Sequence, residues 1–296
     1  MFGKRGDSDK IAESWELAAN PDGSSIILWE GKKITLSQFL ATYGTVFLGT
    51  HCAGSDALSV LIKLIDAKTD LSIQVHPDDA YAKRVEHGTG KSELWYILDA
   101  TPDAFLYCGV NRAVTREELE QRIQNHTLPE ILRRVTPVPG MSYYIPAGTI
   151  HAIGGGVLLA EIQQNSNITY RVYDYDRRDA AGNLRELHIQ KALETAQLAP
   201  QPLMRPFPMT PVSGGTVQLL QKCSFFSTQV VTVTSSVVGT ADETSFRHLL
   251  MLSGSGTLNG ENDTISLQKG DSLLIPAGYG SYHVTGSCRY LETWKD

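Results

Sequence analysis

The sequence predicts a mainly β protein made of two sandwich-like or barrel-like domains. Three observations lead to this fold class. Short segments rich in aliphatic, β-branched and aromatic residues recur along the chain, and Gly, Pro, Asn and Asp bound them, as in antiparallel sheets. One motif, G-x-S-x-x-I-P-A-G, occurs twice, beginning at Gly140 and at Gly270. A proline-rich stretch separates the two copies.

In the first part of the chain, eight segments have the composition of strands. They are residues 25–31, 58–66, 71–77, 93–100, 104–110, 141–148, 155–164 and 168–176.

Helices are expected to be few. In residues 115–135, Thr115 stands three residues before Glu118, the spacing of a capping box, and Leu119 and Ile123 follow at helical spacing. We expect a small helical excursion over about residues 112–135. A second helix is predicted within 184–198 and a short third one within 37–44. The buried stripe of the second helix should consist of Leu187, Ala192, Leu193 and Ala196.

The proline-rich stretch predicts a linker. Five prolines fall between Pro200 and Pro211, and Gly214 and Gly215 follow, so this stretch cannot form a helix or an inner strand. We therefore expect a first domain over residues 1–197, a linker over 198–214 and a second β domain over 215–296. Strands of the second domain are predicted within residues 217–235, 247–260, 263–278 and 288–294.

The two copies of the repeat suggest duplicated β domains, but they diverge after the shared motif. His151 lies five residues after Pro146, whereas Ser281 lies five residues after Pro276. The nearest histidine of the second copy, His283, falls two positions further along. If the protein has a metal site, we expect only the first copy to keep it.

Composition limits the partners. The chain has 296 residues, 42% of them hydrophobic, which is enough to form hydrophobic cores. A net charge of −6 leaves no broad basic surface for nucleic acid or an anionic membrane, so we expect neither partner. An anionic ligand would have to be held by a few local cations. We expect a monomer or a weak homodimer.

The cysteines, the lack of a long apolar run and the N-terminal residues suggest a cytoplasmic protein. The four cysteines are far apart and lack the CxxC spacing of zinc fingers and redox motifs, so free thiols are expected. No apolar run approaches the roughly 20 residues that span a bilayer, and the first ten residues lack the apolar core of a signal peptide.

Four side chains form a candidate metal site. Gln74 and His76 are two residues apart in a predicted strand, so they share one face of it. Glu93 begins another predicted strand, and His151 follows the first copy of the repeat. A single histidine is more often a structural residue than a ligand. Two imidazoles, a carboxylate and an amide oxygen at strand ends are nevertheless a suitable set for one divalent metal.

The motifs resemble those of the cupin superfamily and, within it, of type I phosphomannose isomerases in their short bacterial form. The matching segments are ESWELA, LSIQVHPDDAYA, GKSELWYIL and the run from YIPAGTIHAI through TYRVYDYDRR, in family order over most of residues 11–195. The resemblance implies two cupin-like jelly-roll β-sandwich domains, the second of them degenerate. It also implies an aldose–ketose isomerase that interconverts mannose 6-phosphate and fructose 6-phosphate through a cis-enediol.

The resemblance also implies roles for individual residues. One zinc ion per chain would be held by Gln74, His76, Glu93 and His151. Arg171 matches the catalytic arginine of the family, and Glu161 matches an active-site carboxylate. Contacts to the substrate's phosphate or hydroxyl groups are implied for Lys91 and Ser72, and Trp15 would border the sugar site.

Several alternatives stay open at this stage. The proton-transferring base could be Glu161, a zinc-bound water or Arg171, and Glu161 could instead only orient a metal ligand. Two histidines and a carboxylate would also suit iron(II) in a cupin oxygenase, although such an enzyme has no need of Lys91 and Arg171 at the metal. A non-catalytic cupin that binds a sugar phosphate is a further alternative. Arg177 is expected to pair with a neighbouring aspartate.

Overall fold

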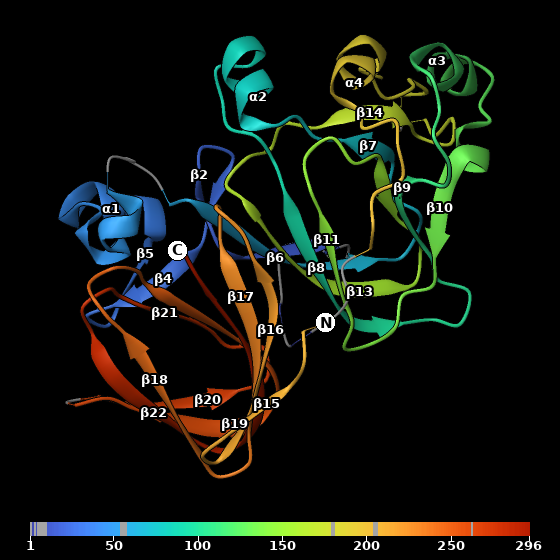
Figure 1. The fold of residues 1–296 in the computed structure, drawn as a ribbon. Helices are drawn as coiled ribbons and strands as arrows, with labels where there is room; N and C mark the ends of the chain where they lie inside the picture. The colour runs from blue at the N-terminus through green and yellow to red at the C-terminus, as the bar shows by residue number, and fades with distance from the viewer. Residues whose placement is uncertain are drawn as a thin grey trace. The chain divides into compact units, whose positions relative to one another are not determined.

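The structure is a computed structural model that describes residues 2, 4, 11–53, 58–178, 181–203, 207–261 and 263–296. It is mainly β, with several β-sheets, which confirms the predicted mainly β class (Figure 1). The chain forms two compact units, unit 1 with Met1–Lys63 and Arg205–Asp296, and unit 2 with Leu64–Met204. The expected division into residues 1–197, 198–214 and 215–296 stays a prediction.

Unit 2 is a sandwich of two antiparallel sheets. Neighbouring strands of the first sheet are, in order, β6 (Val60–Ala67), β13 (Val157–Gln164), β8 (Glu93–Ala100) and β11 (Ser142–Ile145). The second sheet has the order β10 (Leu132–Val135), β9 (Leu106–Val110), β12 (His151–Ile153), β7 (Ile73–Val75) and β14 (Tyr170–Tyr173).

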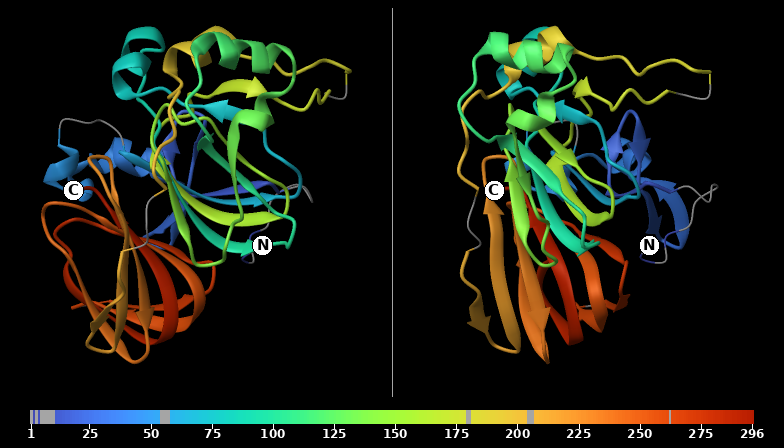
Figure 2. Two further views of the ribbon diagram at one scale, coloured as in Figure 1. Left: turned by 45° about the vertical axis from the view of Figure 1, so that its right-hand side comes forward. Right: turned by 90° about the vertical axis from the view of Figure 1, so that its right-hand side faces the viewer.

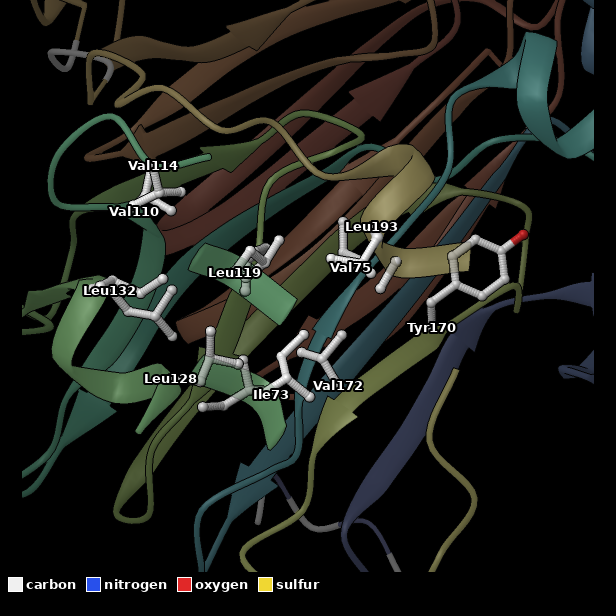
Figure 3. Packing of buried hydrophobic residues seen from close by; sticks show 14 of the residues in the cluster. Ile73, Val75, Val110, Val114, Leu119, Leu128, Leu132, Tyr170, Val172 and Leu193 are labelled. Carbon is white, nitrogen blue, oxygen red and sulfur yellow. The ribbon is translucent and has the colours of Figure 1, made fainter. Parts of the chain in front are cut away.

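Two apolar layers flank the second sheet of unit 2. One lies between the sheets, where Trp95 and Ile97 of β8 pack with Leu106 of β9 and Ile153 of β12. The other joins the opposite face of the second sheet to the helices (Figure 3). There, Val75 and Tyr170 of the sheet belong to the same buried cluster as Leu119 and Leu193 of the helices. The second sheet is therefore buried on both faces.

Three helices cover the second sheet on one side of unit 2 (Figure 1). They are α2 (Asp79–Val85), α3 (Arg116–Gln124) and α4 (Ile189–Thr195), and a short 3₁₀ turn, η3 (Leu128–Ile131), follows α3. The predicted cap of α3 is confirmed, because Thr115 Oγ1 accepts a hydrogen bond from the Glu118 amide at 3.1 Å.

Two details of the helices differ from the predictions. Helix α2 was not predicted, although Asp78 is its N-cap and accepts from the Tyr81 amide at 2.8 Å. The stripe predicted for α4 was wrong at Leu187, whose side chain is 39% exposed. The reason is that α4 begins only at Ile189, since the His188 amide bonds to the Arg171 carbonyl of β14 instead of continuing a helix upstream.

The C-terminal part of unit 1 is one large antiparallel sheet whose long strands curl around a single core (Figure 2). Its order is β15 (Thr210–Val212), β16 (Gly215–Lys222), β17 (Ser227–Val233), β22 (Gly280–Trp294), β19 (Arg247–Asn259) and β20 (Thr264–Gln268), with β18 (Ser236–Ala241) paired to β22 and β21 (Ser272–Ile275) paired to β19. Pro211 is tolerated because β15 is an edge strand.

The N-terminal part of unit 1 contains shorter elements. These are β1 (Glu13–Leu17), the hairpins β2 (Ala19–Asn20) with β3 (Gly23–Ser24) and β4 (Ile26–Trp29) with β5 (Lys32–Thr35), helix α1 (Leu36–Tyr43), and the 3₁₀ turns η1 (Val46–Leu48) and η2 (Thr50–Cys52). The expected short helix within residues 37–44 is thus confirmed as α1.

The sequence repeat is also a repeat of backbone conformation. Gly148 and Gly278, at the end of the two IPAG turns, have φ values of 86° and 78°, a region that favours glycine. After the turn the copies differ, because His151 is buried whereas Ser281 and His283 are exposed on β22. The shared motif therefore encodes the turn, and the buried histidine belongs to the first copy.

The predicted free thiols are confirmed. All four cysteines are unpaired, with Cys52, Cys108 and Cys288 buried and Cys223 partly exposed. In the part of the chain that the structure describes, no helix has both the length and the apolar character that a membrane crossing would need.

The apolar layer under the helices gives a stability prediction. Leu119→Ala removes a fully buried side chain from this cluster, so the free energy of unfolding should fall by about 2–5 kcal/mol in urea titrations. The matched control is Leu184→Ala, because Leu184 is 53% exposed and should change stability by no more than about 0.5 kcal/mol. Equal effects of the two substitutions would show that α3 does not anchor the sheet.

Candidate metal centre

The strand register of unit 2 brings the predicted site residues together. Gln74 of β7 is paired with His151 of β12 on one side and with Arg171 of β14 on the other. Directly paired residues of antiparallel strands project to the same face, so these three side chains form one row across the second sheet. His76 follows two residues after Gln74 and Glu93 opens β8 of the first sheet.

His76, Glu93 and His151 converge on one point, as predicted. His76 Nε2 lies 3.2 Å from Glu93 Oε1, and His151 Nε2 lies 3.7 Å from Glu93 Oε2. One ligand atom of each residue lies within 4.8 Å of those of the other two. All three side chains are only 1% exposed. The Gln74 amide completes the group, with Nε2 at 3.4 Å from His151 Nε2.

Backbone carbonyls determine which nitrogen of each imidazole carries the proton. His76 Nδ1 is 2.9 Å from the Ile168 carbonyl oxygen, and His151 Nδ1 is 2.8 Å from that of Thr149. Because a carbonyl can only accept, both Nδ1 atoms donate and both Nε2 atoms keep a lone pair. Each Nε2 lone pair is therefore available to a metal.

Burial keeps both imidazoles neutral. It lowers the pKa of His76 to about 3, with a further contribution from the nearby Lys91 ammonium. Burial also lowers the pKa of His151. Neutral imidazole is the form that binds a metal ion, so proton competition is weak at neutral pH.

The residues present fit a divalent cation. His76 Nε2 is buried and makes no hydrogen bond within the described residues, and the Glu93 carboxylate oxygen 3.2 Å away also only accepts. Acceptors facing one another in a buried site are costly unless a cation lies among them. Two imidazoles and a carboxylate, without a thiolate, are a donor set that suits zinc. Rotating the Gln74 side-chain amide by half a turn would exchange its nitrogen and oxygen and would add an oxygen ligand to this set.

Lys91 lies at the same point of the site. Its Nζ is 2.9 Å from Glu93 Oε1, and both side chains are buried. Burial alone would raise the pKa of Glu93, but Lys91 and the adjacent His76 outweigh it and hold this pKa well below its usual value. Glu93 is therefore ionised, as a metal ligand must be.

Sequence reasoning missed the part that Trp95 takes in this site. Its aromatic ring packs in the layer between the sheets. In addition, its Nε1 donates hydrogen bonds to Glu93 Oε2 and to Glu161 Oε2, each at 3.1 Å. The alternation of side chains along a strand could have indicated the contact between Trp95 and Glu93, because these residues are two apart and share a face of β8. Glu161 is buried, as expected for an active-site carboxylate.

Arg171 lies on β14, next to β7, and Ser72 immediately precedes β7. Arg171 Nη1 donates to the Glu186 carbonyl at 3.0 Å, while its buried Nε makes no hydrogen bond within the described residues. Burial, followed by the charge of Arg185, lowers the pKa of Arg171. Ser72 is buried two residues before Gln74. Arg177 pairs with Asp174, as expected.

Trp15 belongs to β1 of unit 1. There, Lys63 Nζ lies 5.1 Å from the centre of its ring, and the ring lines a cavity of about 450 Å³. The contact between Trp15 and a sugar stays a prediction.

Comparisons with known proteins agree with this geometry. The family model of the type I phosphomannose isomerase catalytic domain matches residues 5–144, and that of the mannose-6-phosphate isomerase cupin domain matches residues 216–293. Mannose-6-phosphate isomerase ManA of Bacillus subtilis is 36% identical over 289 residues, which cover 96% of this chain and 90% of the relative. Mannose-6-phosphate isomerase of Streptococcus mutans is 32% identical over 299 residues, covering 99% of this chain and 91% of the relative.

Solved structures show the same fold. A crystal structure of the mannose 6-phosphate isomerase from Bacillus subtilis matches with a TM-score of 0.91 at 35% identity, covering 99% of this chain and 92% of that one. A zinc-bound mannose 6-phosphate isomerase matches with a TM-score of 0.77 at 17% identity, covering 97% of this chain and 91% of that one, which shows a shared fold. Sequence and structure together place the chain in the type I mannose-6-phosphate isomerase family, as an isomerase with cupin domains.

Proposed function

We propose that this isomerase works with one zinc ion per chain, held by His76, Glu93, His151 and Gln74, and that mannose 6-phosphate and fructose 6-phosphate interconvert through a cis-enediol. The observation that carries the proposal is the convergence of a buried carboxylate and two buried imidazoles whose Nδ1 protons are already committed to backbone carbonyls. When bound, zinc would act as a Lewis acid toward the oxygens on C1 and C2 of the sugar.

The reaction moves protons and needs no redox partner. From the open-chain aldehyde, a base removes the C2 proton while O1 gains a proton, which gives the cis-enediol. A proton is then delivered to C1 as O2 loses its proton, which gives the ketose. We assign the carbon-to-carbon transfer to Glu161, because its buried carboxylate lies on the same face as Glu93 and within one hydrogen bond of Trp95.

Cations next to the ligands suit an anionic substrate. Arg171 stands in the same strand row as Gln74 and His151, and its Nε has no hydrogen-bond partner among the described residues. Lys91 supplies a second positive charge at Glu93. We assign the substrate's phosphate or hydroxyl groups to Lys91, Arg171 and Ser72, through charge-assisted hydrogen bonds from the two cations.

The other reactions considered from the sequence have less support. The two-histidine, one-carboxylate set would also suit iron(II) in an oxygenase. The two cations at the site and the family assignment favour isomerisation instead. A binding protein without turnover would not need the proposed acid–base group beside the proposed metal ligands.

Metal removal tests the zinc requirement. Conversion of mannose 6-phosphate, followed by coupled detection of fructose 6-phosphate, should cease after EDTA treatment and return on addition of zinc. His76→Ala should also abolish turnover and reduce bound zinc to well below one ion per chain. The control is His283→Ala, which changes an exposed histidine of the second repeat copy and should leave both readouts unaltered. Full activity after chelation would refute the metal's role.

Glu161→Gln separates proton transfer from ligand orientation. If the carboxylate transfers the proton, kcat should fall by about 10²–10⁴-fold. Zinc content and affinity should stay as in the parent, because the Trp95 indole still donates to Glu93. A drop in zinc affinity that accounts for the lost activity would show instead that Glu161 only orients the metal site.

A further inference from the structure

Trp95 connects the metal-ligand carboxylate to the second buried carboxylate of the site. One N–H group serves two acceptors, because Nε1 lies 3.1 Å from both Glu93 Oε2 and Glu161 Oε2. The strand register explains the geometry. Glu161 is paired directly with Trp95 across β13 and β8, and Glu93 lies two residues before Trp95 on the same face.

Trp95 also lies against an imidazole ligand. The ring centres of Trp95 and His151 are 5.4 Å apart, with an interplanar angle of 71°, which is an edge-to-face arrangement. The rest of the indole is fully buried in the apolar layer between the sheets. Trp95 thus contacts Glu93, His151 and Glu161 while its own position is held by the core.

We propose that Trp95 is a positioning residue that orients Glu93 for the metal and holds Glu161 beside it. The inference rests on the proposed zinc site. The indole N–H engages Oε2 of Glu93, while Oε1, the oxygen nearest to His76 Nε2, faces the ligand group. A donor that is rigid and buried restricts rotation of the carboxylate, as outer-shell partners of metal ligands do.

The shared N–H group also fixes the two carboxylates relative to each other. Glu93 and Glu161 are both buried, and one oxygen of each accepts from the same indole N–H. Without this donor, the Glu93 carboxylate would lose the contact that restricts its rotation, so it would be a weaker ligand.

Trp95→Phe removes the donor and keeps an aromatic ring in the core. In titrations with a competing chromogenic chelator, the folded variant should bind zinc about 10–100-fold more weakly than the parent. The matched control is Trp294→Phe. It removes an indole N–H that donates to Asp296 Oδ1 at 3.0 Å in unit 1, and it should leave zinc affinity unaltered.

A second substitution tests the coupling between the two carboxylates. Trp95→Phe combined with Glu161→Gln offers Glu93 an amide N–H in place of the lost indole N–H. The double variant should therefore recover part of the zinc affinity that Trp95→Phe loses, although it lacks the proposed base. A residue that acted only by filling the core would show no such recovery.

If Trp95→Phe does not fold, as judged by circular dichroism, benzothienylalanine at position 95 replaces the N–H by sulfur within a ring of similar shape. It should weaken zinc binding by the same factor. Zinc affinity equal to that of the parent in a folded variant, or no recovery in the double variant, would overturn the inference. A parent protein that binds no zinc would refute the proposed metal site itself, and the inference with it.

Discussion

The site depends on three lone-pair atoms being held together inside the protein. His76 Nε2, His151 Nε2 and the Glu93 carboxylate have no proton to share, because both Nδ1 protons go to backbone carbonyls. Such an arrangement is unfavourable in an apolar interior unless a cation joins it. Lys91 supplies one positive charge at Glu93, and the geometry leaves the imidazoles available to a metal.

The two sheets of unit 2 contribute different chemistry to this point. The second sheet carries Gln74, His151 and Arg171 in one row, so it contributes two of the proposed ligands and a cation. The first sheet carries the carboxylates, with Trp95 between them. Because neighbouring residues of a strand face opposite sides, a shift of one residue in either register would turn these groups away from the site.

The duplicated turn shows that the same backbone motif can occur with and without a buried histidine after it. Both copies keep glycine at the end of IPAG with positive φ, so both make the same turn. Only in the first copy does the following strand direct a histidine inward. In the second, Tyr282 is the buried residue, and its neighbours Ser281 and His283 are exposed. The turn is retained because the backbone needs it, independently of any ligand.

The sequence by itself determined the β class, the repeated turn, the N-cap of α3 and the three residues that converge as a candidate metal site, because these follow from strand period and short motifs. It did not place helix α2, the start of α4 at Ile189 or the double role of Trp95. The last two depend on long-range contacts, namely the bond from the His188 amide to Arg171 and the pairing of Glu161 with Trp95. Only the tertiary structure decided them, because hydrogen-bond partners far apart in the chain meet only when the sheets have formed.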